Sequence, residues 1–68
     1  MRGEDLLGAE DAILDVLRRS GVAQPAQRIT EQLSNRGFEP SLVRIAIQYL
    51  LDRREIELTH DWQLRTAA

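Results

Sequence analysis

The order of hydrophobic patterns along this chain constrains its fold more than any other feature of the sequence. Three stretches with the spacing of an amphipathic helix come first. A short alternating stretch at residues 55–59 follows, and a second one at residues 62–65 mirrors it across His60 and Asp61. Two alternating stretches separated by two residues predict a β-hairpin. We therefore expect a mostly α domain, with three packed helices and a small β-hairpin at its C-terminal end.

The length of 68 residues limits the chain to one small domain. Such a domain buries only about 60% of the surface of its unfolded chain, which leaves no room for a deep catalytic cleft beside the core. There is no cysteine, so disulfides, thiolate zinc ligands and a thiol nucleophile are excluded together. The first residues are too polar for a signal peptide or a membrane span. We expect a soluble, cytoplasmic protein.

The distribution of charge does not favour a nucleic-acid ligand. The formal net charge is −2, with four arginines against six acidic residues in residues 1–33 and five against five in residues 34–68. Proteins that bind nucleic acids usually carry a positive patch, because neutralisation of phosphates supplies most of their non-specific affinity. Neither half of this chain is basic.

The first two helical stretches each predict one buried face. In the first, residues 9–19, Ile13 and Leu17 lie one turn apart, and the acidic residues near its start and the arginines at its end are expected to be a solvated face. The second begins at Pro25, because proline lacks the N–H that is unpaired at a first helical position, and it ends before Gly37.

The third helical stretch, residues 40–53, has an unusually wide apolar surface. Its core-facing stripe consists of Val43, Ala46, Ile47 and Leu50. A second apolar stripe beside it consists of Leu42, Ile45 and Tyr49. The polar arc that remains is narrow and holds little more than Ser41, Arg44, Gln48 and Asp52. This apolar surface is wider than one side of a three-helix core requires.

The predicted folded domain spans residues 9–65, between an N-terminal extension of residues 1–8 and a frayed tail of residues 66–68. No repeat, low-complexity run or linker divides it. Its expected core is a set of aliphatic residues from the helices and the hairpin: Ile13, Val16, Leu17, Ile29, Leu33, Val43, Ile47, Leu50, Ile56, Leu58 and Leu64.

Two segments resemble the winged helix-turn-helix family. The run LVRIAIQYLLDRREIEL at residues 42–58 looks like its recognition helix and first wing strand, and QRITEQL at residues 27–33 is similar to its second helix. The resemblance implies a winged helix, which is a three-helix bundle with a two-stranded wing. There are two departures: Arg54 stands where the family usually has glycine, and His60 and Asp61 occupy the wing tip in place of basic residues.

By this resemblance the third helix would enter the major groove of DNA. Arg44 could pair with guanine and Gln48 with adenine, each pair giving about 1–3 kcal/mol of discrimination. Ser41 and Arg65 complete the predicted DNA-binding residues, and so small a set of base readers implies a dimer. A solvated edge of a packed helix explains Arg44 and Gln48 equally well.

The second apolar stripe favours a protein ligand instead. With Trp62, the side chains of Leu42, Ile45 and Tyr49 could form an exposed patch of about a few hundred Å², a size that marks partner surfaces. An ordinary core contact explains Ile45 and Tyr49 slightly better, whereas Leu42 is expected to be exposed. Two hypotheses therefore stand. By analogy with the family's fold, the first is a small DNA-binding transcription regulator, and the alternative is a protein-interaction or assembly module, including one that self-associates. The charge around Arg44 and the exposure of the stripe distinguish them.

Catalytic, metal and cofactor sites have no support in the sequence. His60 is the only histidine, and no cysteine or second histidine is present to complete a metal site. Glu10 and Asp11 are adjacent on a helix and diverge by about 100°, which is wrong for paired acid–base work. There is no glycine-rich phosphate loop and no nucleophile elbow. We expect a non-enzymatic protein without a cofactor or metal.

Overall fold

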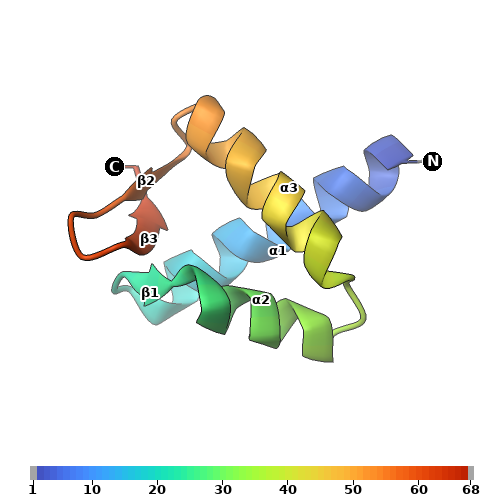
Figure 1. Cartoon of the computed structure of the whole chain (residues 1–68), viewed down its shortest axis with the longest axis horizontal. Coiled ribbons are helices and arrows are strands. Elements are labelled where there is room, and N and C mark those ends of the chain that lie inside the picture. The colour runs from blue at the N-terminus through green and yellow to red at the C-terminus, as the bar shows by residue number, and fades with distance from the viewer. Residues whose placement is uncertain (1, 68) are drawn as a thin grey trace.

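Three helices and a small antiparallel sheet form the fold in the computed structural model, which describes residues 2–67, with side chains described for residues 5–67. The helices are α1 (Arg2–Ser20), α2 (Ala26–Asn35) and α3 (Pro40–Asp52). In Figure 1, α3 crosses in front of α1 while α2 runs along the lower side. The predicted mostly α architecture is confirmed. None of these helices is long and apolar enough to cross a lipid bilayer.

The predicted N-terminal extension forms the first turns of α1. The helix begins at Arg2 and not at Ala9, so residues 2–8 are its first residues. Met1 lies outside the described residues. Glycine disfavours a helix at position 8, but tertiary packing overrides this propensity. Leu6 packs against the core, and a Cβ atom at Gly8 would lie 3.8 Å from Cε1 of Phe38. The N-terminal turns of α1 therefore pack against the core and lie beside Phe38, which precedes α3.

The limits of α2 and α3 lie close to the predicted ones. Pro25 is the N-cap of α2, one residue before its first helical residue. The chain leaves α2 through Gly37, whose φ of 99° is in the left-handed region that favours glycine. The N–H groups of Gly37 and Phe38 donate to the carbonyl oxygens of Ser34 and Leu33, each at 3.0 Å. These bonds satisfy carbonyl groups at the end of the helix.

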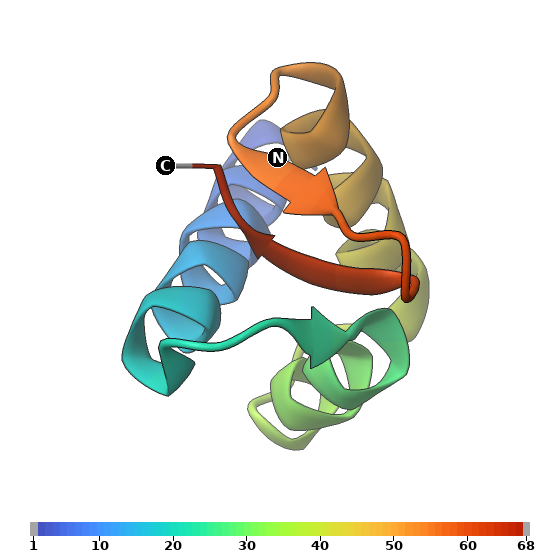
Figure 2. The same cartoon turned by 90° about the vertical axis from the view of Figure 1, so that its left-hand side faces the viewer.

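The sheet has three strands, where the sequence predicted two. They are β1 (Gln24–Pro25), β2 (Ile56–Leu58) and β3 (Gln63–Thr66), in the order β1-β3-β2 with both pairs antiparallel. Figure 2 shows β3 passing between the other two strands. A strand of two residues is too short to produce an alternating pattern, which is why the sequence did not predict β1 as part of the sheet.

The turn between β2 and β3 is one residue longer than predicted. A two-residue turn would pair Leu58 with Gln63, but Leu58 pairs with Leu64. Trp62 therefore belongs to the turn, with a left-handed φ of 67°, and not to the second strand of the hairpin. The N–H of Thr59 donates to the carbonyl oxygen of Gln63 at 2.7 Å, and the carbonyl oxygen of Thr59 accepts from the N–H of Trp62 at 2.9 Å.

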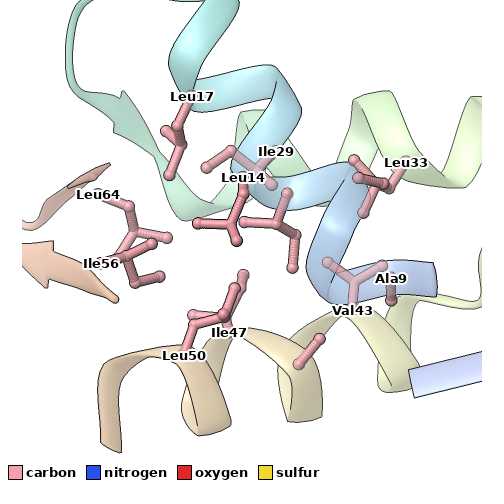
Figure 3. Close-up of a cluster of buried hydrophobic side chains, with 13 residues drawn as sticks. Ala9, Leu14, Leu17, Ile29, Leu33, Val43, Ile47, Leu50, Ile56 and Leu64 are labelled. Carbon is pink, nitrogen blue, oxygen red and sulfur yellow. The ribbon is translucent and has the colours of Figure 1, made fainter. Parts of the chain in front are cut away.

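Aliphatic side chains from the three helices and the sheet point toward one another in a shared core (Figure 3). Nine of the predicted core residues are buried there: Ile13, Leu17, Ile29, Leu33, Val43, Ile47, Leu50, Ile56 and Leu64. Two predictions were wrong. Val16 is only partly buried, and Leu58 is 45% exposed because it lies at the end of β2 next to the turn. The core also contains Ala9, Ala12 and Leu14.

The predicted tail is part of the fold as far as it is described. Thr66 is the last residue of β3 and pairs with Ile56. The N–H of Ala67 donates to the carbonyl oxygen of Glu55 at 3.0 Å. Ala68 lies outside the described residues. The hairpin therefore continues to the end of the described chain.

We expect Leu50→Ala and Ile47→Ala each to lower the free energy of unfolding by about 2–5 kcal/mol, because each removes most of a buried aliphatic side chain. Leu50 is fully buried and should show the larger effect. Leu58→Ala is the control, and as an exposed substitution it should change stability by less than about 0.5 kcal/mol. Chemical denaturation measures all three. Equal effects of Leu50→Ala and Leu58→Ala would contradict this packing.

Candidate interaction surface

The outer side of α3 is not covered by any other described element in either view (Figures 1 and 2). Its exposed side chains form two rows. The polar row consists of Ser41, Arg44 and Gln48, and the apolar row consists of Ile45 and Tyr49, one helical turn apart. The rows lie side by side on a single straight helix, which makes this surface the strongest candidate for a binding site.

The exposure of the side chains beside the polar row is the opposite of what the sequence predicted. Ile45 is 49% exposed and Tyr49 is 45% exposed, although a core position was favoured for both. Leu42, which was expected to be exposed, is partly buried against the core. It lines a shallow hollow together with Phe38 and Asp5 from the N-terminal part of α1. The prediction failed because it started α1 at residue 9, and so left out the N-terminal turns that lie beside Leu42.

Arg44 is the free cation of the polar row. It forms no ion pair with any residue whose side chain is described. Gln48, by contrast, donates a hydrogen bond from Nε2 to Oδ1 of Asp52 at 3.3 Å. Arg44 and Gln48 border a hollow between α2 and α3 that is also lined by Glu31. Glu31 of α2 therefore borders the same hollow as this cation, so the row is not a strongly positive patch.

Arg65 does not join the other predicted DNA-binding residues. It lies on β3 opposite Glu57 of β2, and its Nη2 atom is 3.2 Å from Oε1 of that glutamate. Both side chains are exposed. The structure thus brings Ser41, Arg44 and Gln48 together on α3, whereas Arg65 stands on the sheet with its charge offset by a neighbour.

Trp62 is likewise separate from the apolar row. Its side chain is 76% exposed in the turn between β2 and β3. Leu58, the last residue of β2 beside this turn, is also exposed. Figure 1 shows this turn at the left-hand end of the molecule, away from the middle of α3. The predicted partner-binding residues therefore divide into three environments: Leu42 against the core, Ile45 and Tyr49 on α3, and Trp62 on the turn.

The sequence did not reveal an ion pair that joins α1 to the end of α3. Glu10 is buried, with 3% exposure, although it was expected on a solvated face. Arg53 donates from Nη2 to Oε1 of Glu10 at 2.7 Å and from Nε to Oε2 of Glu55 at 2.9 Å. The hydrogen bonds to Glu10 and then to Glu55 raise the pKa of Arg53 above its ordinary value. An arginine guanidinium is charged throughout the accessible pH range in any case, so the pair does not depend on the ionisation of Arg53.

Chemical groups for catalysis are sparse in the described part of the chain. No group of three or more histidine and acidic side chains among residues 5–67 is arranged to hold a metal ion. The imidazole of His60 is on the exposed turn, with Nε2 3.3 Å from Oδ1 of Asp61.

We find no match to this chain among protein-family models, curated proteins or solved structures.

We expect Arg53→Met to lower the melting temperature clearly, because it leaves the carboxylate of Glu10 buried without its cation. Arg54→Met is the matched control, since Arg54 forms no ion pair with the described side chains and should change little. The double variant Glu10→Met, Arg53→Met should recover part of the loss, because it removes the buried charge as well. Thermal unfolding followed by circular dichroism measures all three. Equal melting temperatures for Arg53→Met and Arg54→Met would contradict a structural role for the pair.

Proposed function

We propose that this chain is a non-enzymatic protein-interaction module with a winged-helix arrangement, and that it contacts its partner with the outer side of α3. The arrangement is supported by the element order α1-β1-α2-α3-β2-β3, in which the helices precede a β2–β3 hairpin. It is also supported by Arg54, which has a φ of 63° at the position where the resemblance leads one to expect glycine.

The observation that carries the proposal is the exposure of Ile45 and Tyr49, one turn apart on the side of α3 that no other described element covers. Single exposed apolar residues are common on protein surfaces, but adjacent ones with polar surroundings mark partner sites. Tyrosine is enriched in protein interfaces because it combines a large apolar ring with a polar hydroxyl group. Arg44 and Gln48 beside this row would form the polar rim of such a contact.

The charges around α3 support a protein rather than a nucleic acid as the first candidate. The whole chain has a net charge of −2. Of the predicted DNA contacts, Arg65 is paired with Glu57 and Gln48 is bonded to Asp52. DNA binding gains most of its affinity from cations that neutralise phosphates. Arg44 is the single cation on the polar row, so that contribution would be small.

We expect Ile45→Asp and Tyr49→Asp to abolish capture of a protein partner from a lysate of the native host, while both variants stay folded. Each places a charge where the apolar row would be buried in the complex. Arg28→Asp, an exposed substitution on α2, is the matched control and should retain the partner. Leu42→Asp should unfold the domain, because Leu42 packs against the core.

The capture is read by mass spectrometry with and without nuclease, and circular dichroism checks that each variant is folded. A partner held equally by wild type and by Tyr49→Asp would overturn the role of α3. Release of the captured proteins by nuclease would show that they were held through nucleic acid.

DNA binding is the second candidate, favoured by the position of Arg44 and Ser41 on an uncovered helix. In that case Arg44→Ala should weaken binding and Arg54→Ala should not. The plot of log K against log salt should have a slope of only about −2 to −4 per monomer, because few arginines are free to reach phosphates. Gel-shift titration with a random-sequence duplex pool measures both. No retained duplex at low salt would exclude this candidate.

A further inference from the structure

We propose that a second copy of this chain binds the outer side of α3, with the two α3 helices packed antiparallel about a two-fold axis that crosses them at the level of residue 47. This inference rests on the proposed function, since it names the partner of the same surface. A two-fold contact is self-complementary, because each surface patch meets its own copy. The outer side of α3 has this property in both its apolar and its charged residues.

The apolar row matches itself in the antiparallel orientation. With the axis at position 47, each residue lies opposite the one that is equally far on the other side of that position. Ile45 therefore lies opposite the partner's Tyr49, and Tyr49 lies opposite the partner's Ile45. Two branched aliphatic chains and two aromatic rings would then fill the centre of the contact. Both are about half exposed in the monomer, so pairing removes apolar surface from water.

The charges of α3 match themselves in the same orientation. Arg44 would lie at the same level along the helix axis as the partner's residue 50. The partner's Asp52 is two residues further along, about 3 Å away in the axial direction, which is within reach of an arginine side chain. In the monomer Arg44 has no ion pair with the described side chains, and Asp52 accepts a hydrogen bond only from the neutral amide of Gln48. Pairing would supply each with an opposite charge, twice in the dimer. In a parallel orientation Arg44 would face the partner's Arg44.

The size of this surface indicates a weak, reversible dimer. A stable interface buries about 800 Å² on each partner, and one exposed helix side supplies less than that. The dimer would also exclude DNA reading by α3. Packed helices lie about 8–10 Å apart, whereas two recognition helices of a DNA-bound dimer are separated by about 34 Å. Self-pairing and the second candidate function therefore predict opposite behaviour of the same residues.

Sedimentation equilibrium of the purified chain, up to high micromolar concentration, tests the pairing. Wild type should show a reversible monomer–dimer equilibrium, and Ile45→Asp should be monomeric. Arg44→Asp and Asp52→Arg should each weaken the dimer by about tenfold, because both ion pairs become like-charge contacts. The double variant Arg44→Asp, Asp52→Arg should recover the affinity, since it exchanges the two charges. Arg28→Asp, which changes the net charge by the same amount as Arg44→Asp, should leave the dimer unchanged.

Cross-linking tests the orientation. The chain has no cysteine, so an introduced cysteine is the only thiol that can react. Gln48→Cys is next to the proposed axis and should give a covalent dimer with a short bismaleimide. Ser41→Cys should not, because antiparallel pairing places the two copies of position 41 about 18 Å apart along the axis at 1.5 Å per residue. A parallel pair would cross-link at both positions and would overturn the proposed orientation.

Failure of this inference can be told from failure of the proposed function. A chain that sediments as a monomer at every concentration, or a dimer that tolerates Ile45→Asp, overturns self-pairing. Charge reversals at Arg44 and Asp52 that behave like Arg28→Asp overturn it as well. If Ile45→Asp still abolishes capture of a different protein in those cases, α3 remains the binding surface and only the identity of the partner is wrong.

Discussion

The packing of α1 across α3 determines which side of α3 is exposed, and the contact between Glu10 and Arg53 joins the two helices at the C-terminal end of α3. A buried carboxylate is costly unless a cation and hydrogen bonds compensate for its lost hydration. Arg53 does so from the C-terminal end of α3, through a 2.7 Å bond to Oε1 of Glu10. With α1 held there, its N-terminal part reaches the start of α3, where Leu42 becomes partly buried. Ile45 and Tyr49, further along the helix, stay open to solvent.

Hydrophobic spacing was enough to predict the three helices and most of the core, because long amphipathic segments repeat the same signal over several turns. Pro25 and Gly37 marked the limits of α2 because their backbone preferences act locally. The features that were missed depend on distant contacts. Glu10 and Arg53 are 43 residues apart in the sequence, and nothing near either residue indicates the pair. The extra residue in the hairpin turn was missed because an aromatic side chain rarely adopts the left-handed φ found at Trp62.

The candidate site was predictable as a set of residue types on one helix but not as a surface. The exposed positions of Ser41, Arg44 and Gln48 follow from the angular spacing of α3 alone. Which apolar residues beside them are covered depends on the length of α1, which local propensity underestimated. Pairing of Arg65 with Glu57 depends on strand register, and the register depends on the turn. Errors in the start of α1 and in the length of the hairpin turn therefore changed which apolar residues and which charges were expected to be free on the surface.

The composition of β1 restricts how another chain can attach to the sheet. This strand is two residues long and lies at the edge of the sheet, and one of its residues is Pro25, which has no N–H to offer a further strand. A peptide that recognises partners by extending a sheet would find little backbone to bond along this edge. Main-chain hydrogen bonds depend little on the partner's sequence, and β1 offers few of them to a partner. A partner that approaches from the α3 side must instead match particular side chains, so selectivity would depend on a few positions that single substitutions can change.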